Sequence, residues 1–239
     1  MDFQLILESL PKLLSATLLT LNLVAVSMAL GMVLAVPIAL LRLSKHKWMM
    51  APAFGYIFFF RSTPLLVQLF IVYYGLSQFP SIRSSFLWPI LREPYWCSII
   101  AFTLNTSAYT AEILRGAIQS VPWGQIEAGL AMGMSRFLLF RRIIIPQAIL
   151  IALPGYTNEV ILLLKSSALA STVTLLELTG MTRNIIAVTF KPIELYVTAG
   201  CIYLMLVFLI TRTFFGIEHL YSAHRRPSKR SRPVPEPAS

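Results

Sequence analysis

Five apolar stretches, each long enough to cross a lipid bilayer, dominate the chain. Roughly 20 apolar residues, rising about 1.5 Å each in an α-helix, cross a hydrocarbon core of about 30 Å. Lipid also requires every backbone hydrogen bond to be satisfied internally, which favours helices where the sequence lacks barrel-type alternation. We therefore expect five transmembrane helices, over residues 13–41, 52–79, 95–119, 143–164 and 195–215.

Polar residues interrupt three of these stretches. The second contains Arg61-Ser62-Thr63-Pro64. Because proline lacks an N–H donor, we expect the helix to break there, with Ser62 and Thr63 capping the next helix, and a role in gating is the alternative. Polar side chains are costly inside a membrane, so each one marks a candidate functional position. The others are Asn105, Glu112 and Arg115 in the third stretch, and Asn158 and Glu159 in the fourth.

The composition excludes an ordinary soluble domain. Hydrophobic residues make up 56% of the chain and charged residues 13%, and the mean hydropathy is +0.72, which is far more apolar than a typical soluble protein. We predict an all-α integral membrane protein whose single domain covers residues 1–220. Residues 221–239 form a basic tail, expected to be disordered because it is rich in Pro and Ser.

Basic residues are unevenly distributed among the connections between the predicted spans. Because Lys and Arg concentrate in cytoplasmic connections, we predict an external N-terminus and a cytoplasmic C-terminus. The net charge of +10 could indicate a nucleic-acid partner. We expect none, because a basic segment beside a membrane usually sets topology and attracts anionic lipid. This orientation places 14 of the 20 Lys and Arg residues on the cytoplasmic side: Arg42, Lys45, Lys47, Arg61, Arg115, Arg136, Arg141, Arg142, Arg212, Arg225, Arg226, Lys229, Arg230 and Arg232.

Catalytic and metal chemistry have little support in the sequence. Cys97 and Cys201 fall within predicted spans, and His46, His219 and His224 fall at span ends without metal-ligand spacing. An intramembrane enzyme would need a nucleophile with a base, or a metal cluster. We expect no metal and no directly bound cofactor. An ion-coupled secondary transporter stays an alternative, although five spans do not divide into two equal repeats.

The connection between the third and fourth spans, residues 120–142, leads into the most distinctive pattern. EAGLAMGMSRFLLFRRIIIP, from Glu127 to Pro146, mixes charged, apolar and small residues, as in an amphipathic helix at a membrane surface. Ala128, Gly129 and Gly133 would share one face of a continuous helix, because residues i and i+4 are neighbours. We expect this face to dock into a groove of a partner protein.

This segment resembles the EAA signature of the permease subunits of binding-protein-dependent ABC importers. That consensus is EAA, three residues, G, nine residues, I, one residue, LP. The spacing matches throughout, with Gly129 for the second Ala and Ile145 for Leu. FRSTPLLVQ at 60–68 and LNTSAYTAEI at 104–113 resemble the FRGTPLLVQL and LNTAAYTAEI segments of polar amino acid permeases. Residues 152–169 are similar to the M-type subunits of histidine/arginine/ornithine and opine permeases.

The resemblance implies a five-helix type I importer permease in a bacterial inner membrane. Its implied partners are a pair of ATP-binding subunits, a second homologous permease subunit and an external solute-binding protein. ATP and Mg would be bound by the ATP-binding subunits, since this chain has no GxxxxGK[ST] sequence. The implied solute is a cationic amino acid (histidine, arginine, lysine or ornithine) or an opine. Coupling to the ATPase is expected at Glu127, Ala128, Gly129 and Gly133.

A candidate solute pathway is suggested by the polar residues inside the spans. A buried carboxylate can pair with a cationic amino acid, and an amide can hydrogen-bond its polar ends. Two structural alternatives stay open: Glu112 pairs with Arg115 one turn away, or Glu159 caps a helix break near Pro154. The pathway residues are Glu159, Asn158, Glu112, Asn105 and Tyr109.

The connection over residues 168–192 is the candidate outer gate. It contains Glu177, Arg183 and Lys191 between two predicted spans. We expect these side chains to contact the solute-binding protein.

Overall fold

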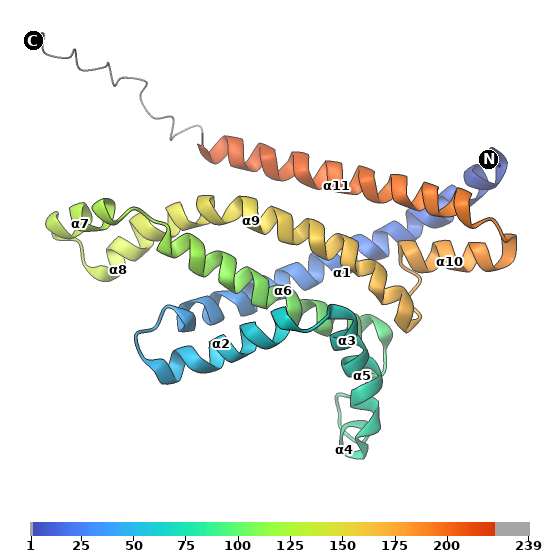
Figure 1. Cartoon of the computed structure of the whole chain (residues 1–239), viewed down its shortest axis with the longest axis horizontal. Helices are drawn as coiled ribbons and strands as arrows, with labels where there is room; N and C mark the ends of the chain where they lie inside the picture. The colour runs from blue at the N-terminus through green and yellow to red at the C-terminus, as the bar shows by residue number, and fades with distance from the viewer. Residues whose placement is uncertain (1, 223–239) are drawn as a thin grey trace, which may run out of the picture.

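The computed structural model describes residues 2–222, and this part of the chain consists of helices without strands (Figure 1). Five long helices form its body: α1 (Phe3–Arg42), α2 (Lys47–Ser62), α6 (Pro94–Gln119), α9 (Ile145–Ser166) and α11 (Pro192–Ser222). The shorter elements are α3 (Leu65–Phe70), η1 (Ile71–Gly75), η2 (Leu76–Gln78), α4 (Pro80–Arg83), α5 (Trp88–Leu91), α7 (Trp123–Ala131), α8 (Arg136–Leu139), η3 (Phe140–Ile144), η4 (Ser167–Val173) and α10 (Leu178–Thr189). The predicted basic tail falls beyond the described residues, apart from the end of α11.

The all-helical class is confirmed, but the number of spans is not. Within residues 2–222, three segments are long and apolar enough to cross a membrane: Phe3–Arg42, Arg136–Val173 and Pro192–Leu220. Lys47–Ser62 and Leu65–Gln78 qualify together as a fourth, bent by 103°. The predicted third span, now α6, does not meet the same criterion. A count of five spans therefore stays a prediction.

Helix α6 is too polar to meet that criterion. It can be so polar because it is the central helix of the described residues. It packs against α1, α2, α3 and α9, so its polar side chains face protein rather than lipid. Gly31 of α1 allows a close approach to α6, since a Cβ there would lie 2.5 Å from Thr106 Cγ2. The buried polar positions of α6 are Ser98, Thr103, Asn105, Thr106, Ser107 and Thr110.

Helix α1 begins at Phe3, ten residues before the predicted span. Asp2 is its N-cap, and the Asp2 carboxylate accepts a hydrogen bond from the Leu5 N–H at 3.1 Å. The carboxylate also pairs with Lys191, just before α11. The contact with Lys191, and after it the hydrogen bond from Leu5, lowers the pKa of Asp2, and the contact with Asp2 raises the pKa of Lys191. The start of α1 is thereby tied to the start of α11.

The second predicted span breaks at Pro64, as expected. Thr63 is extended, with φ −104° and ψ 143°, because the proline ring disfavours helical geometry in the preceding residue. Proline also leaves the Phe60 carbonyl without its helical donor. Gln68 Nε2 (2.9 Å) and Asn105 Nδ2 (3.1 Å) donate to that oxygen instead. The expectation that Ser62 and Thr63 cap α3 is wrong, since α3 has no side-chain cap.

The connection between α9 and α11 is folded into η4 and α10, and Glu177 is buried within it. The Glu177 carboxylate caps α10 by accepting from the N–H groups of Gly180 (2.9 Å) and Thr179 (3.0 Å), and also from the Tyr203 hydroxyl (3.1 Å). Glu177 is therefore a structural N-cap, and its expected contact with a solute-binding protein is wrong. Arg183 and Lys191 are exposed.

Candidate functional site

A polar pocket of about 400 Å³ opens beside the break at Pro64. Its walls come from three elements that are far apart in the sequence: the break between α2 and α3, the middle of α6, and α9. Its polar and charged lining residues are Arg61, Ser62, Thr63, Asn105, Tyr109, Glu159 and Ser166. Two of these, Arg61 and Glu159, bring opposite charges to one cavity.

Glu159 projects from α9 and is only 6% exposed. Its carboxylate accepts a hydrogen bond from the Thr106 hydroxyl on α6 at 2.8 Å. Helix α9 runs from Ile145 to Ser166 with Pro154 inside it, so there is no helix break for Glu159 to cap. The alternative of a capping role for Glu159 is wrong. A carboxylate with remaining acceptor capacity suits a cationic ligand.

Arg61 supplies the positive charge of the pocket. Its guanidinium carbon lies 5.0 Å from the centre of the Tyr109 ring, a cation–π contact that orients the side chain. None of the ion pairs found among residues 2–222 involves Arg61. The sequence analysis counted Arg61 among the cytoplasmic basic residues and placed it in the segment of the helix break, but did not include it in the solute pathway, although a basic residue inside a predicted span was already a signal of a pathway position.

Glu112 is neutralised by two arginines. Arg115 Nη2 lies 2.8 Å from Glu112 Oε2, and Arg42 Nε of α1 lies 3.4 Å from Glu112 Oε1. The predicted alternative of pairing with Arg115 is confirmed, and Arg42 adds a second partner. Glu112 lines a neighbouring pocket of about 290 Å³, which shares Arg61, Ser62 and Tyr109 with the first.

The two predicted asparagines differ in position. Asn105 lines the Glu159 pocket, but its amide donates to Phe60 O and to Gln68 Oε1 (3.0 Å), so it also holds the helix break together. Asn158 is exposed and is not among the lining residues of that pocket. The structure therefore brings Asn105, Tyr109 and Glu159 together but leaves Asn158 apart. Thr106 and Gln68 went unnoticed because isolated Thr and Gln carry no distinctive sequence signal.

The predicted coupling segment is not one continuous helix. Helix α7 ends at Ala131, and Gly133 adopts a left-handed φ of +77°. The Met134 N–H bonds to Gly129 O (3.1 Å) and the Gly133 N–H to Leu130 O (2.9 Å), the two bonds of a Schellman motif with glycine at C′. Gly133 therefore ends the helix, and it does not share a helical face with Ala128 and Gly129.

Gly129 packs against its own chain. It is buried, and a Cβ there would lie 2.5 Å from Leu139 Cδ1 and 3.0 Å from Ile143 Cδ1. The predicted contact face of small residues is therefore wrong as an external surface. Glu127 and Ala128 are exposed, and Glu127 Oε1 accepts from Trp123 Nε1 at 2.7 Å.

Large apolar side chains form the outer surface of this segment instead. Trp123 is 67% exposed, Met132 82% and Phe137 74%. Figure 1 shows α7 and α8 at one end of the molecule, opposite the N-terminus and α10. Exposed apolar residues at a projecting end suit a contact with another protein or with the membrane.

Long apolar helices that enclose a charged pocket are the arrangement expected of a membrane transport subunit. The chain matches the model of the family described as binding-protein-dependent transport system inner membrane component over residues 27–217, and it belongs to that family. This confirms the resemblance read from the EAA-like segment. The chain is a permease of an ABC importer and not an ion-coupled secondary transporter.

Relatives support the assignment along nearly the whole chain. The octopine transport system permease protein of Rhizobium meliloti is 54% identical over 223 residues, covering 93% of this chain and 91% of the relative. The histidine/lysine/arginine/ornithine transport system permease protein of Escherichia coli (strain K12) is 41% identical over 211 residues, covering 88% and 89%. A crystal structure of an amino acid ABC transporter with histidines matches with a TM-score of 0.83 at 33% identity, covering 92% of this chain and 99% of that one.

Proposed function

We propose that this permease translocates a cationic amino acid or an opine through the pocket beside Pro64. The observation that carries the proposal is that Glu159 and Arg61 line one cavity. A basic amino acid carries a carboxylate and cationic groups, so it complements both charges. The names of the relatives, which transport octopine or basic amino acids, support the same solute class.

Each side chain has a distinct role in this proposal. Glu159 accepts hydrogen bonds from the cationic end of the solute. Arg61 grips the solute carboxylate through a planar, bidentate guanidinium, and the Tyr109 ring keeps that guanidinium in position. Glu112 is already paired with Arg42 and Arg115, so it leaves Arg61 available for the solute.

Coupling to ATP hydrolysis is proposed at the projecting end of the molecule. Trp123, Met132 and Phe137 would fill a hydrophobic groove on one of a pair of ATP-binding subunits, with Glu127 and Ala128 at its edge. ATP and Mg bind to those subunits. A second permease subunit completes the membrane unit, an external solute-binding protein delivers the solute, and the N-terminus lies outside.

The test of the solute site is a Glu159→Gln substitution in the assembled transporter. Because a hydrogen bond to a charged group contributes about 1.5–3 kcal/mol, we expect uptake at low solute concentration to fall by about tenfold to a hundredfold. Substrate-stimulated ATPase activity should fall with it. Asn158→Ala, at the adjacent exposed position, is the control and should keep both activities. Wild-type uptake by the Glu159→Gln variant would exclude a cation contact at this carboxylate.

A further inference from the structure

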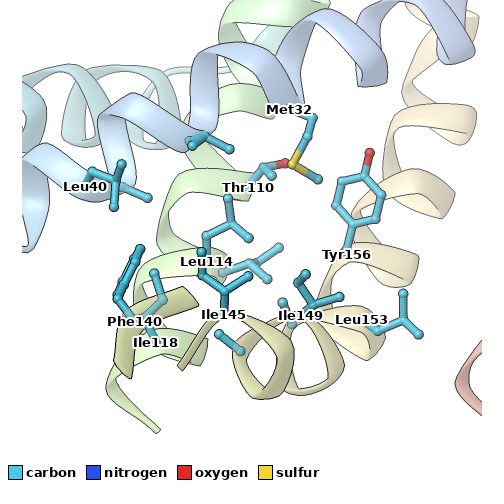
Figure 2. Close-up of a pocket in the computed structure, with 15 residues that line it drawn as sticks. Met32, Leu40, Thr110, Leu114, Ile118, Phe140, Ile145, Ile149, Leu153 and Tyr156 are labelled. Atoms are coloured by element: carbon cyan, nitrogen blue, oxygen red, sulfur yellow. The ribbon is translucent and has the colours of Figure 1, made fainter. Parts of the chain in front are cut away.

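The pocket of about 290 Å³ that contains Glu112 adjoins the solute pocket of Glu159 and Arg61. We call it the Arg42 pocket, and α1, α2 and α6 supply its lining residues: Arg42, Phe54, Ile57, Phe58, Arg61, Ser62, Tyr109 and Glu112. Because Arg61 lines both pockets, a solute carboxylate held by Arg61 lies beside both. The apolar cavity in Figure 2 has no charged lining residue and none in common with the solute pocket. Of these two neighbouring cavities, the Arg42 pocket is the one suited to a further charged part of the solute.

Positive charge exceeds negative charge around the Arg42 pocket. Its charged lining residues are Arg42, Arg61 and Glu112. Glu112 is already occupied by Arg115, whose Nε lies 3.1 Å from Oε1 and whose Nη2 lies 2.8 Å from Oε2. One carboxylate therefore faces three guanidiniums, and the surplus favours an anionic ligand group.

Arg42 keeps most of its hydrogen-bond donors for a ligand. Its Nε lies 3.4 Å from Glu112 Oε1, the longest contact of that cluster, and its two Nη groups make no hydrogen bond found among residues 2–222. The guanidinium carbon lies 5.0 Å from the centre of the Phe54 ring, just as the guanidinium of Arg61 lies against Tyr109. An aromatic ring thus orients each of the two guanidiniums before a solute arrives.

The charges of the two pockets together match a solute with a cationic side chain and two carboxylates at its other end. Glu159 faces the cationic side chain and Arg61 the first carboxylate, which leaves Arg42 for a second one. An unmodified basic amino acid has only one carboxylate. A basic amino acid whose α-nitrogen bears a carboxyalkyl group has two, and both lie at the end of the molecule that Arg61 holds.

We propose that the Arg42 pocket is a subsite for this second carboxylate, and that Arg42 sets the preference for carboxyalkylated basic amino acids over the parent amino acids. The inference rests on the solute pocket of the proposed function. The Nη groups of Arg42 bind the second carboxylate as a planar fork. Glu112 weakens this attraction, because its negative charge lies against the same guanidinium.

The experiment measures equilibrium binding of two ligands to the complete transporter, purified in detergent without its solute-binding protein. One ligand is arginine, and the other is arginine with a carboxyethyl group on its α-nitrogen, here called carboxyethyl-arginine. Wild type should bind carboxyethyl-arginine more tightly. Arg42→Gln should weaken its binding about tenfold, the lower end of the effect of a hydrogen bond to a charged group, and should leave arginine binding unchanged.

Glu112→Gln should produce a change of opposite sign. It removes the carboxylate that competes for Arg42, so binding of carboxyethyl-arginine should tighten relative to that of arginine. A substitution that only disturbed the packing of α1 on α6 would weaken both ligands alike and leave their ratio unchanged. Lys45→Gln removes an equal charge at an exposed position three residues after Arg42, and it should change neither affinity.

The ratio of the two affinities decides the outcome. A ratio that Arg42→Gln leaves unchanged, or equal affinities in wild type, would overturn the subsite, and an inorganic anion as the occupant of the Arg42 pocket would give that same unchanged ratio. Arginine binding would then still support the pocket of Glu159 and Arg61. Binding of neither ligand would overturn the solute pocket and the subsite with it.

Discussion

At the scale of single residues, the sequence indicated which side chains line the cavities more readily than it indicated what each side chain does there. Glu159 and Glu112 stood out because carboxylates are rare inside spans, and both do occupy cavities. Arg61 was not predicted to belong to the solute pathway, because its contact with Tyr109 joins segments that are distant in sequence. The prediction that Gly129 and Gly133 share a helix face was wrong for a related reason. Spacing of four residues places two side chains on one face only if the helix continues between them, and α7 ends before Gly133.

Gly133 gives a test that separates backbone strain from external crowding. A Cβ at Gly133 would meet nothing within 4 Å, but its φ of +77° costs an ordinary L-residue about 1–2 kcal/mol. Gly133→Ala should therefore lower the melting temperature and the uptake rate of the transporter, while Gly133→Asn, which tolerates left-handed geometry better, should lie nearer to wild type. A lower uptake rate for the larger Asn variant than for Ala would indicate crowding against a partner instead.

At the scale of elements, long apolar stretches predicted the helices well, and Pro64 predicted the break in the second span. The sequence did not reveal how the break is stabilised, because its braces lie elsewhere: Gln68 is in the following helix and Asn105 in α6. Asn105 thus belongs both to the wall of the solute pocket and to the support of the bend. The shape of that pocket depends on these amide contacts.

Removing the nearer brace should destabilise the bend. Gln68 is 4% exposed, and its amide donates to Phe60 O and to Thr63 Oγ1 (2.7 Å). Gln68→Leu leaves the Thr63 hydroxyl without this donor and should lower the free energy of unfolding by about 1–2 kcal/mol. The readout is the denaturation midpoint of the transporter in detergent. Gln78→Leu, at an exposed position with one hydrogen bond to Tyr74 O, should have little effect. Equal midpoints for the two variants would contradict a bracing role.

At the scale of the whole molecule, the sequence predicted an all-helical membrane protein but not its internal order. Helix α6 is buried by four other helices, which explains how a span so rich in Ser, Thr and Asn is accommodated. Glu177 looked like a gate residue because it lies in the connection between two predicted spans, yet it caps α10 and accepts from Tyr203 of α11. Long-range contacts of this kind have no local sequence pattern.

The ion pair between Asp2 and Lys191 predicts a specific dependence on pH. The hydrogen bond with Lys191 lowers the pKa of Asp2 below 3.8, so its contribution to stability is complete above that value and is lost as pH falls through the lowered pKa. The pKa of Lys191 is raised above 10.5, so its contribution is lost as pH rises through the raised value. Between these limits, Asp2→Asn should lower the melting temperature by a small, constant amount.

The difference in melting temperature between wild type and Asp2→Asn should shrink in about 1 M salt. The screening length falls to about 3 Å there, and the side chains of Asp2 and Lys191 are both accessible to solvent. Glu8→Gln removes an acidic group on α1 that makes no ion pair among residues 2–222, and it serves as the control. Asn keeps a side-chain oxygen that can cap α1, so a difference that persists unchanged in high salt would contradict an ionic contribution from Asp2.

The central claim is that Glu159 and Arg61 together recognise a cationic amino acid. It is tested most directly by measuring equilibrium binding of arginine and of its neutral isostere citrulline to the transporter without its solute-binding protein. The account predicts that wild type binds arginine more tightly and that Glu159→Gln abolishes this preference. It also predicts that Arg61→Gln weakens binding of both ligands, because both carry the carboxylate. An unchanged preference for arginine in the Glu159→Gln variant would contradict the account.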